Sequence, residues 1–322
     1  MDDKQSFSSN KLKQLTSKKQ KLDIFRPLPQ ELVKNLDEWF KVELTYTSNA
    51  IEGNTLTRAE TALVVEKGIT VAGKSLKEHL EATNHVEALD YIKTLVSKRR
   101  EDIGEQDILS IHRLILRKIE EPHAGRYRTL PARLTGSETI LPNPMKIQSL
   151  MQDFLAWIRG NNPDHPVKIA ADAHAKLVTI HPFSDGNGRT ARLLMTLILM
   201  QAGYPIAVVR KEDRLAYVEA LELSQVKGDL NTFYNLIYDA VDRSLDIYLE
   251  AVEAEKSEER ETPLEKRFYT TDEVAKILQV NPESVRRYVR RGKLRAVKLG
   301  GKFIRIEKAD LDRFIEMSKT TS

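Results

Sequence analysis

The chain has 322 residues, of which 30% are charged and 41% are hydrophobic, and its formal net charge is +4. No apolar run reaches the roughly 20 residues that a membrane-spanning helix needs, and the N-terminus is not typical of a signal peptide, so we expect no membrane partner. The absence of cysteine excludes disulfides, thiolate metal sites and a cysteine nucleophile, and it fits a cytoplasmic protein.

The positive charge is concentrated near the C-terminus. Residues 263–322 contain 15 basic and 8 acidic residues, a net charge of +7, so the rest of the chain carries −3. A chain of this length is expected to form two or three structural units.

The N-terminal part should be helical after a polar start. Residues 1–27 are rich in lysine and predict a flexible leader. Residues 28–100 follow as a helical region, in which a first helix should run from Gln30 to about Thr47. His79 and His85 lie among polar residues there, and we expect both at the surface.

The stretch from Ser48 to Gly53 closes this first helix. Gly53 is a typical C-cap residue, which places Glu52 on the last turn. A carboxylate there is mildly unfavourable beside the negative end of the helix dipole. This misfit predicts a partner for Glu52 elsewhere in the chain.

Residues 101–255 are expected to form the main helical core. The apolar run at 108–116 predicts a buried helix, which makes His112 a structural histidine rather than a catalytic one. A non-helical stretch at 125–144 then contains strand-compatible segments around a turn at residues 136–137.

The stretch His-Pro-Phe-Ser-Asp-Gly-Asn-Gly-Arg-Thr-Ala-Arg at residues 181–192 lies between two apolar helices. The first carries apolar residues three and four positions apart, and it ends because Pro182 keeps His181 out of helical geometry. The second is almost entirely apolar and runs to Gly203. The stretch therefore forms a loop at a helix N-terminus.

This loop contains the groups that bind an anion. Gly186, Asn187 and Gly188 can take positive φ angles, so that successive backbone N–H groups point into one concavity and suit a phosphate. Arg189 and Arg192 are three residues apart, and both can add charged hydrogen bonds from one helix face.

The same loop contains groups that suit a transfer reaction. Asp185 is a hard oxygen ligand, as a phosphate-bound Mg²⁺ requires. His181 titrates near neutral pH and can take a proton from an attacking hydroxyl. Together with the arginines they predict phosphoryl or nucleotidyl transfer. The alternative is a polar loop that only caps a helix.

Residues 181–192 match the HxFx[D/E]GNGRxxR signature of Fic-domain proteins at every fixed position, and the chain resembles that family over about residues 30–250. The resemblance implies transfer of AMP from ATP, with Mg²⁺, to a Ser, Thr or Tyr hydroxyl of a target protein. His181 would be the general base and Asp185 the Mg²⁺ ligand.

The remaining roles also follow from the resemblance. Residues 186–188 would cradle the phosphates, Arg189 would hold the triphosphate, and Arg192 would hold its γ end. Three residues resemble the wall of the adenine and ribose site, although aromatic residues at such spacing are more often core: Tyr217, Asn231 and Tyr234.

Residues 48–53 match the family's inhibitory motif, [S/T]xxxE[G/N], with Ser48 at its start. By resemblance, Glu52 pairs with Arg192, so that the γ-phosphate loses its partner and ATP binds unproductively. The alternative is an ordinary surface glutamate. The family also implies a β-hairpin flap, here at residues 129–141, which would hold the target by strand addition. A homodimer is plausible for the family.

A charged run that ends in proline predicts a linker at residues 256–266. Residues 267–322 should then form a module of their own. A capping box at 270–273 starts one helix, and residues 281–282 start a second as N-cap and first residue. Two strands should flank the glycine pair at 300–301.

The second helix of this module is basic. Helix, turn, basic helix and β-wing resemble the winged helix-turn-helix of excisionase and MerR-type proteins, which implies DNA binding. Lys298 and Lys302 would lie on the wing. The alternative is a protein-binding module with solvated arginines. The arginines of the second helix are Arg286, Arg287, Arg290 and Arg291.

We therefore expect a mainly α-helical protein with a Fic-type core, a small β-hairpin flap and a C-terminal winged helix-turn-helix module. It should be a protein adenylyltransferase that Glu52 inhibits. One alternative is removal of AMP at the same site, with Glu52 orienting a hydrolytic water. Another is a DNA-binding transcription regulator whose core only senses nucleotide.

Overall fold

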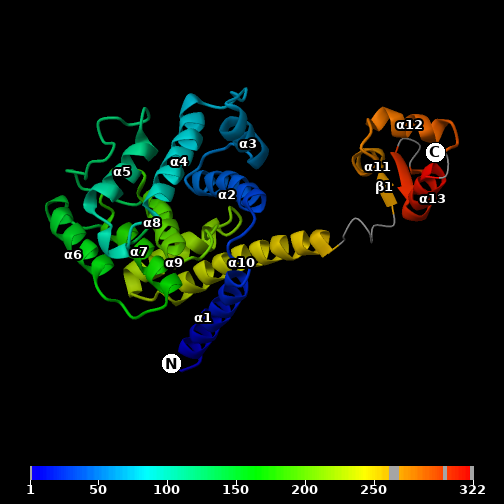
Figure 1. Cartoon of the computed structure of the whole chain (residues 1–322). Helices are drawn as coiled ribbons and strands as arrows, with labels where there is room; N and C mark the ends of the chain where they lie inside the picture. Colours follow the sequence, from blue (N-terminus) through cyan, green and yellow to red (C-terminus); the bar gives the residue numbers. More distant parts are fainter. Residues whose placement is uncertain (1, 261–267, 300–302, 320–322) are drawn as a thin grey trace. The chain divides into compact units, whose positions relative to one another are not determined.

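The computed structural model describes residues 2–260, 268–299 and 303–319, and it shows a mainly α-helical protein, as the sequence predicts (Figure 1). The chain divides into two compact units, Met1–Val252 and Glu253–Ser322. Each unit has a hydrophobic core of its own. None of the helices in the described ranges combines the length and the apolar character that crossing a membrane requires.

The first unit is a bundle of helices. Short 3-10 helices lie at Arg100–Asp102 and Pro144–Lys146. The α-helices are, in chain order, α1 (Asp2–Asp23), α2 (Gln30–Ile51), α3 (Arg58–Lys67), α4 (Leu76–Leu95), α5 (Glu105–Leu116), α6 (Ile147–Arg159), α7 (Pro166–Ile180), α8 (Asn187–Gln201), α9 (Arg214–Lys227) and α10 (Asn231–Arg260).

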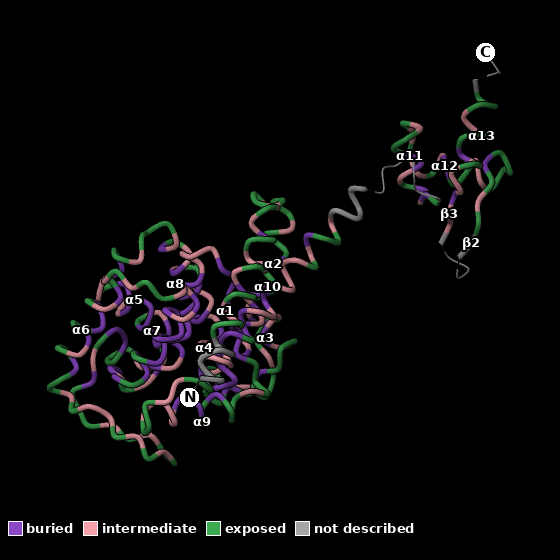
Figure 2. The backbone as a smooth tube through the Cα atoms, turned by 90° about the horizontal axis from the view of Figure 1, so that it is seen from below, coloured by how far each residue is buried: buried purple, intermediate pink, exposed green. Residues whose placement is uncertain are grey.

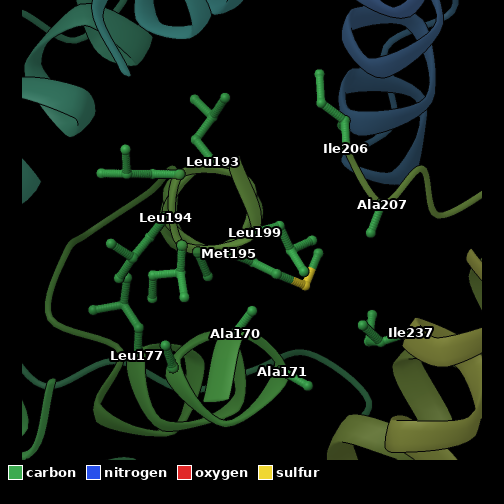
Figure 3. Close-up of a cluster of buried hydrophobic side chains, with 14 of the residues drawn as sticks. Ala170, Ala171, Leu177, Leu193, Leu194, Met195, Leu199, Ile206, Ala207 and Ile237 are labelled. Atoms are coloured by element: carbon green, nitrogen blue, oxygen red, sulfur yellow. The ribbon is translucent and has the colours of Figure 1, made fainter. Parts of the chain in front are cut away.

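Helix α8 lies in the middle of this unit. Its apolar residues point in several directions, with Leu193, Leu194 and Met195 all buried, because neighbouring helices surround it (Figure 3). A helix that is apolar on all sides is stable only in such surroundings. Helix α7 offers the small side chains of Ala170 and Ala171 in the same cluster. Buried positions concentrate in the interior of the unit (Figure 2).

The prediction of a flexible leader at residues 1–27 is wrong, because α1 occupies most of this segment. Leu15 and Leu22 of α1 are buried in the core. Lys18 forms ion pairs of 2.7 Å with Asp242 and with a second aspartate of α10. The two leucines are seven residues apart among lysines, so the apolar stripe of this helix is too sparse to recognise in the sequence.

The expected flap has a different structure from the one predicted. A turn lies at Gly136, where Ser137 N donates to Leu134 O over 3.3 Å, but the structure assigns no strand to residues 129–141. Polar groups of the segment bond to one another, as Thr139 N does to Ser137 Oγ over 3.1 Å, and also to α9. Ser137 Oγ, for example, donates to Glu222 Oε1 over 2.7 Å.

The second unit contains a three-stranded antiparallel sheet with strand order β1-β3-β2. Helix α10 extends to Arg260, so the first residues of the predicted linker are helical, and residues 261–266 lie outside the described residues. The elements are β1 (Phe268–Thr270), α11 (Thr271–Leu278), α12 (Pro282–Arg290), β2 (Val297–Leu299), β3 (Phe303–Glu307) and α13 (Lys308–Lys319).

The predicted helix starts of this unit are confirmed. Thr270 and Glu273 form a capping box at α11, and the Asn281 side chain caps α12. Strand β1 was not predicted; it is three residues long and pairs with β3. The glycine pair at 300–301 and Lys302 lie outside the described residues.

Candidate active site

The loop between α7 and α8 is shaped by two residues with positive φ. His181 ends α7 with φ 50° and donates its N–H to Leu177 O over 3.0 Å. Gly186 precedes α8 with φ 74°, and a Cβ there would lie 3.3 Å from the ring of His112. The positive φ therefore favours glycine at this position, and a larger residue would also press on the His112 ring.

Asn187 fixes the shape of the loop. Its Oδ1 accepts from Phe183 N over 3.0 Å, and its Nδ2 donates to Phe183 O over 2.9 Å. The Phe183 ring is buried and stacks on His112, with ring centroids 3.7 Å apart. The Asn187 side chain thus closes the loop. Because this side chain is engaged by Phe183, a ligand would have to bind Asn187 through its backbone.

His112 supports the loop from α5. Gly125 N donates to His112 Nδ1 over 2.9 Å, so Nε2 must carry the ring proton and donates to Asp185 O at 2.9 Å. Burial lowers the pKa of His112 to about 4, which keeps the ring neutral. The prediction that this histidine is structural is in keeping with these contacts.

Arg189 is buried between two carboxylates. Its Nη2 lies 3.2 Å from Asp185 Oδ2 and its Nη1 lies 3.3 Å from Glu81 Oε1. Both distances exceed the 2.7–2.9 Å typical of charged hydrogen bonds. Within the described part of the chain, Arg189 Nε has no hydrogen-bond partner. This buried donor suits an oxygen-rich anion that the protein alone does not supply.

Arg192 is held by oxygen atoms from two helices. Its Nη2 lies 2.6 Å from Glu52 Oε1, the contact that the resemblance implies, and 2.9 Å from Ser48 O. Its Nε donates to Ser48 Oγ over 2.9 Å, and its Nη1 donates to Tyr217 OH over 3.3 Å. Arg192 is only 3% exposed, so these contacts define where its guanidinium lies.

The Glu52 carboxylate also lies against the first turn of α8. A Cβ built at Gly188 would overlap Glu52 Oε1 and would lie 3.0 Å from Arg192 Nη1. The N-terminal turn of a helix favours a negative charge. The negative charge of Glu52 is unfavourable beside the C-terminal end of α2, but the N-terminus of α8 and Arg192 stabilise it.

The surroundings of His181 favour its neutral form. Burial lowers the pKa of His181 below its usual value of 6.5, and the nearby charge of Arg128 acts in the same direction. The imidazole is therefore neutral at pH 7 and can act as a base. Arg128 Nε donates to His181 O over 2.8 Å.

Arg128 is a residue of the site that sequence reasoning missed. Besides His181, it contacts the segment at residues 129–141 near its start and the residue directly after its end, since Nη1 donates to Leu130 O over 3.0 Å and Nη2 to Pro142 O over 2.7 Å. The Gly-Arg-Tyr-Arg run at residues 125–128, directly before this segment, is a signal that could have pointed to it.

The three predicted adenine-site residues bond to different partners. Tyr217 is buried, and its OH lies 2.7 Å from His174 Nε2 as well as near Arg192. Tyr234 OH donates to Asp172 Oδ1 over 2.5 Å. The Asn231 side chain is exposed and bonds to Asp229. Only Tyr217 thus reaches the arginines of the loop.

The predicted DNA-contacting arginines lie on and directly after α12, and all four are exposed. Arg286 Nη1 lies 3.3 Å from Glu283 Oε2, and Arg290 forms an ion pair with the same carboxylate. Arg287 and Arg291 complete the set. The backbone of Lys298 is in β2, as expected for a wing residue.

The chain is similar to known proteins in both units. Residues 102–199 match the Fic/DOC family, and residues 268–319 match a helix-turn-helix domain family. The chain is 42% identical over 206 residues to protein adenylyltransferase Fic of Nematostella vectensis, which covers 63% of this chain and 48% of that protein. The chain thus spans about half the length of this relative.

Two solved structures have the same fold. One is Fic-1 from C. elegans, with a TM-score of 0.71 and 31% identity over 78% of this chain and 74% of that one. The other is a Fic domain containing signaling protein from Bacteroides thetaiotaomicron, with a TM-score of 0.69 and 32% identity over 76% of this chain and 98% of that one. The chain belongs to the Fic family.

Proposed function

We propose that the protein is an adenylyltransferase that moves AMP from ATP to a Ser, Thr or Tyr hydroxyl of a target protein, and that Glu52 inhibits it. The observation that carries this proposal is the position of Glu52, whose carboxylate pairs with Arg192 and lies against Gly188. A carboxylate at this place can inhibit the protein only if it competes with another anion for Arg192. The relatives named protein adenylyltransferase support ATP as that anion.

The reaction begins when His181 accepts the proton of the target hydroxyl. The hydroxyl oxygen attacks the α-phosphorus of ATP, the bond to the bridging oxygen breaks, and pyrophosphate leaves with the electron pair. Arg189 and Arg192 offset the negative charge of the triphosphate and of the leaving pyrophosphate. The backbone N–H groups of Asn187 and Gly188 supply further donors at the helix N-terminus, while that of Gly186 donates to Asp185 Oδ1.

Asp185 fits the expected Mg²⁺. Its side chain is 40% exposed, while one of its oxygens already accepts from Gly186 N. In the described residues no cluster of three or more metal-binding side chains occurs. Mg²⁺ in nucleotide sites is commonly held by one or two carboxylates together with the substrate phosphates. When bound with ATP, the ion would neutralise phosphate charge.

Inhibition follows from competition for Arg192. With Glu52 in place, all three nitrogens of the Arg192 guanidinium are engaged by Ser48, Tyr217 and Glu52. A γ-phosphate would have to displace the Glu52 carboxylate from Arg192, because the two negatively charged groups repel each other at such a short distance. ATP then binds without its γ-phosphate partner.

Two further partners are proposed from exposed features. The non-helical segment at residues 129–141 is where we place the target peptide, added as a strand. Its Ile140 is 94% exposed and offers an apolar contact. In the second unit, the exposed arginines of α12 suit DNA phosphates or base edges, in keeping with the helix-turn-helix match.

The test compares ATP labelled on the α-phosphate with ATP labelled on the γ-phosphate, using the full chain with Glu52→Gly and a cell lysate as the source of targets. Adenylyl transfer predicts protein labelling from α-labelled ATP alone. Adding His181→Ala should abolish that labelling. Labelling from the γ-phosphate would indicate phosphoryl transfer. Absence of all labelling by a variant that binds ATP would contradict the proposal and favour a nucleotide sensor.

A further inference from the structure

A largely buried carboxylate on α4 connects Arg189 to the turn that carries Glu52. Glu81 Oε1 lies 3.3 Å from Arg189 Nη1, and Glu81 Oε2 accepts from Asn54 Nδ2 over 2.9 Å. The backbone oxygen of Glu81 accepts from Asn49 Nδ2 over 3.2 Å. Glu81 therefore contacts the turn three residues before Glu52 through its backbone oxygen and two residues after it through its carboxylate, where Asn54 Nδ2 also donates to Glu78 O over 3.1 Å.

The turn at residues 49–54 is closed on itself. Glu52 N and Asn54 N both donate to Asn49 O over 3.0 Å, and Gly53 N donates to Ala50 O over 3.1 Å. Its two asparagine side chains are anchored on α4. The contacts made by Glu81 consequently contribute to the position of the Glu52 backbone, and through it to the position of the inhibitory carboxylate.

Arg189 is the member of this network that a ligand can disturb. It is shared between Glu81 and Asp185 at 3.3 and 3.2 Å, both long for a charged pair, and its buried Nε–H has no partner in the described residues. A triphosphate oxygen would bind Arg189 more strongly than Glu81 does at these distances. Glu81 would then lose its cationic partner while it is still mostly excluded from water.

We propose that Glu81 is a positioning residue that couples phosphate binding at Arg189 to release of the turn at residues 49–54, and thereby of Glu52. The inference rests on the proposed function in that a triphosphate is the ligand of Arg189. The inhibitory turn is accordingly sensitive to nucleotide: a triphosphate at Arg189 weakens the contact that anchors the turn on α4.

Hydrogen exchange of residues 48–56 tests the coupling without any enzymatic readout. In the full chain, Glu81→Gln should speed exchange of this segment about tenfold, since it weakens a charged contact to a neutral one. Mg·ATP should speed the same exchange in the wild-type chain and add little in Glu81→Gln. The matched control is Glu87→Gln on the same helix, which removes an exposed ion pair with Arg117.

Unchanged exchange of residues 48–56 in Glu81→Gln would overturn the proposal. An equal rise in Glu87→Gln would also overturn it, because the effect would then be a general loosening of α4. Slower exchange of this segment with Mg·ATP in the wild-type chain would contradict the direction of the coupling.

Transfer of label from α-labelled ATP gives a second test. Glu81→Gln should raise the rate about tenfold in the otherwise wild-type chain and should change it much less in the Glu52→Gly chain, because the inhibitory group is already absent there. A purely structural role would lower the rate in both chains. If Glu52→Gly itself transfers no label, the proposed function fails, and hydrogen exchange alone decides the coupling.

Discussion

Replacing Glu52 by glutamine tests how much of the inhibition comes from one negative charge. Glu52 Oε1 lies 2.6 Å from Arg192 Nη2, and a glutamine would keep the side-chain length and an oxygen that can accept this hydrogen bond. The variant therefore removes the charge while it leaves the shape of the contact. Glu52→Gly removes both.

The size of the effect follows from the surroundings of the pair. Two unit charges about 4 Å apart attract by about 4 kcal/mol at an effective dielectric constant of about 20. Arg192 is buried, but the Glu52 side chain is 34% exposed, so solvent screens part of this attraction. A charged hydrogen bond contributes about 1.5–3 kcal/mol. Its loss corresponds to a rise of about 10- to 100-fold in the fraction of molecules in which residue 52 is released from Arg192.

The assay is the initial rate of AMP incorporation from α-labelled ATP. We expect the initial rate to increase in the order wild type, Glu52→Gln, Glu52→Gly. The rate of the glutamine variant should be at least about tenfold above that of the wild type. Glu43→Gln is the matched control, since Glu43 is on the same helix and pairs with Arg58, away from Arg192. A glutamine variant within twofold of wild type, beside an active glycine variant, would show that the charge is not what inhibits.

Three further predictions concern other groups. In the Glu52→Gly chain, the transfer rate should fall as the pH is lowered through a midpoint below 6.5, because burial lowers the pKa of the base His181; a midpoint above 7 would contradict this. His85, His112 and His174 are buried, and burial lowers their pKa values to about 3, about 4 and about 3, so the unfolded state binds their protons first. The stability that these neutral rings contribute is fully present above pH 6.5 and is lost as the pH falls toward 3. Urea unfolding at pH 5.5 should give a free energy about 4 kcal/mol below that at pH 7.5, and equal values would contradict it. If the second unit binds DNA, Arg287→Ala should make the slope of the logarithm of the binding constant against the logarithm of the salt concentration less steep by about one phosphate contact. An unchanged slope would show that this arginine does not contact the DNA phosphates.

The loop at residues 181–192 could be predicted because its chemistry is contiguous. Base, carboxylate, glycines and arginines all fall within one short stretch, so their proximity follows from the chain itself. The pairing of Glu52 with Arg192 spans 140 residues and came from the family resemblance, with only a dipole misfit as local evidence. The structure places the two groups in contact.

Long-range anchors of the site could not be predicted. Glu81 is 108 residues from Arg189, and nothing in its polar neighbourhood distinguishes it from a solvated helix position. The prediction of His79 and His85 at the surface is wrong for the same reason: both are buried, His79 Nε2 accepts from Val71 N, and His85 bonds to Thr45. Helix α1 was missed because lysines dominate its sequence. In each case, the deciding partner belongs to a distant part of the chain.

The most direct test of the account is whether Glu52 prevents recognition of the γ-phosphate. Calorimetric titration with Mg·ATP and Mg·ADP measures this in the wild-type and Glu52→Gly chains without any need for a target. We predict nearly equal affinities for the two nucleotides in the wild type. In Glu52→Gly, Arg192 is free to bind the γ-phosphate, and ATP should bind about tenfold or more tightly than ADP. The same ATP preference in both chains would contradict the claim that Glu52 and the γ-phosphate compete for Arg192.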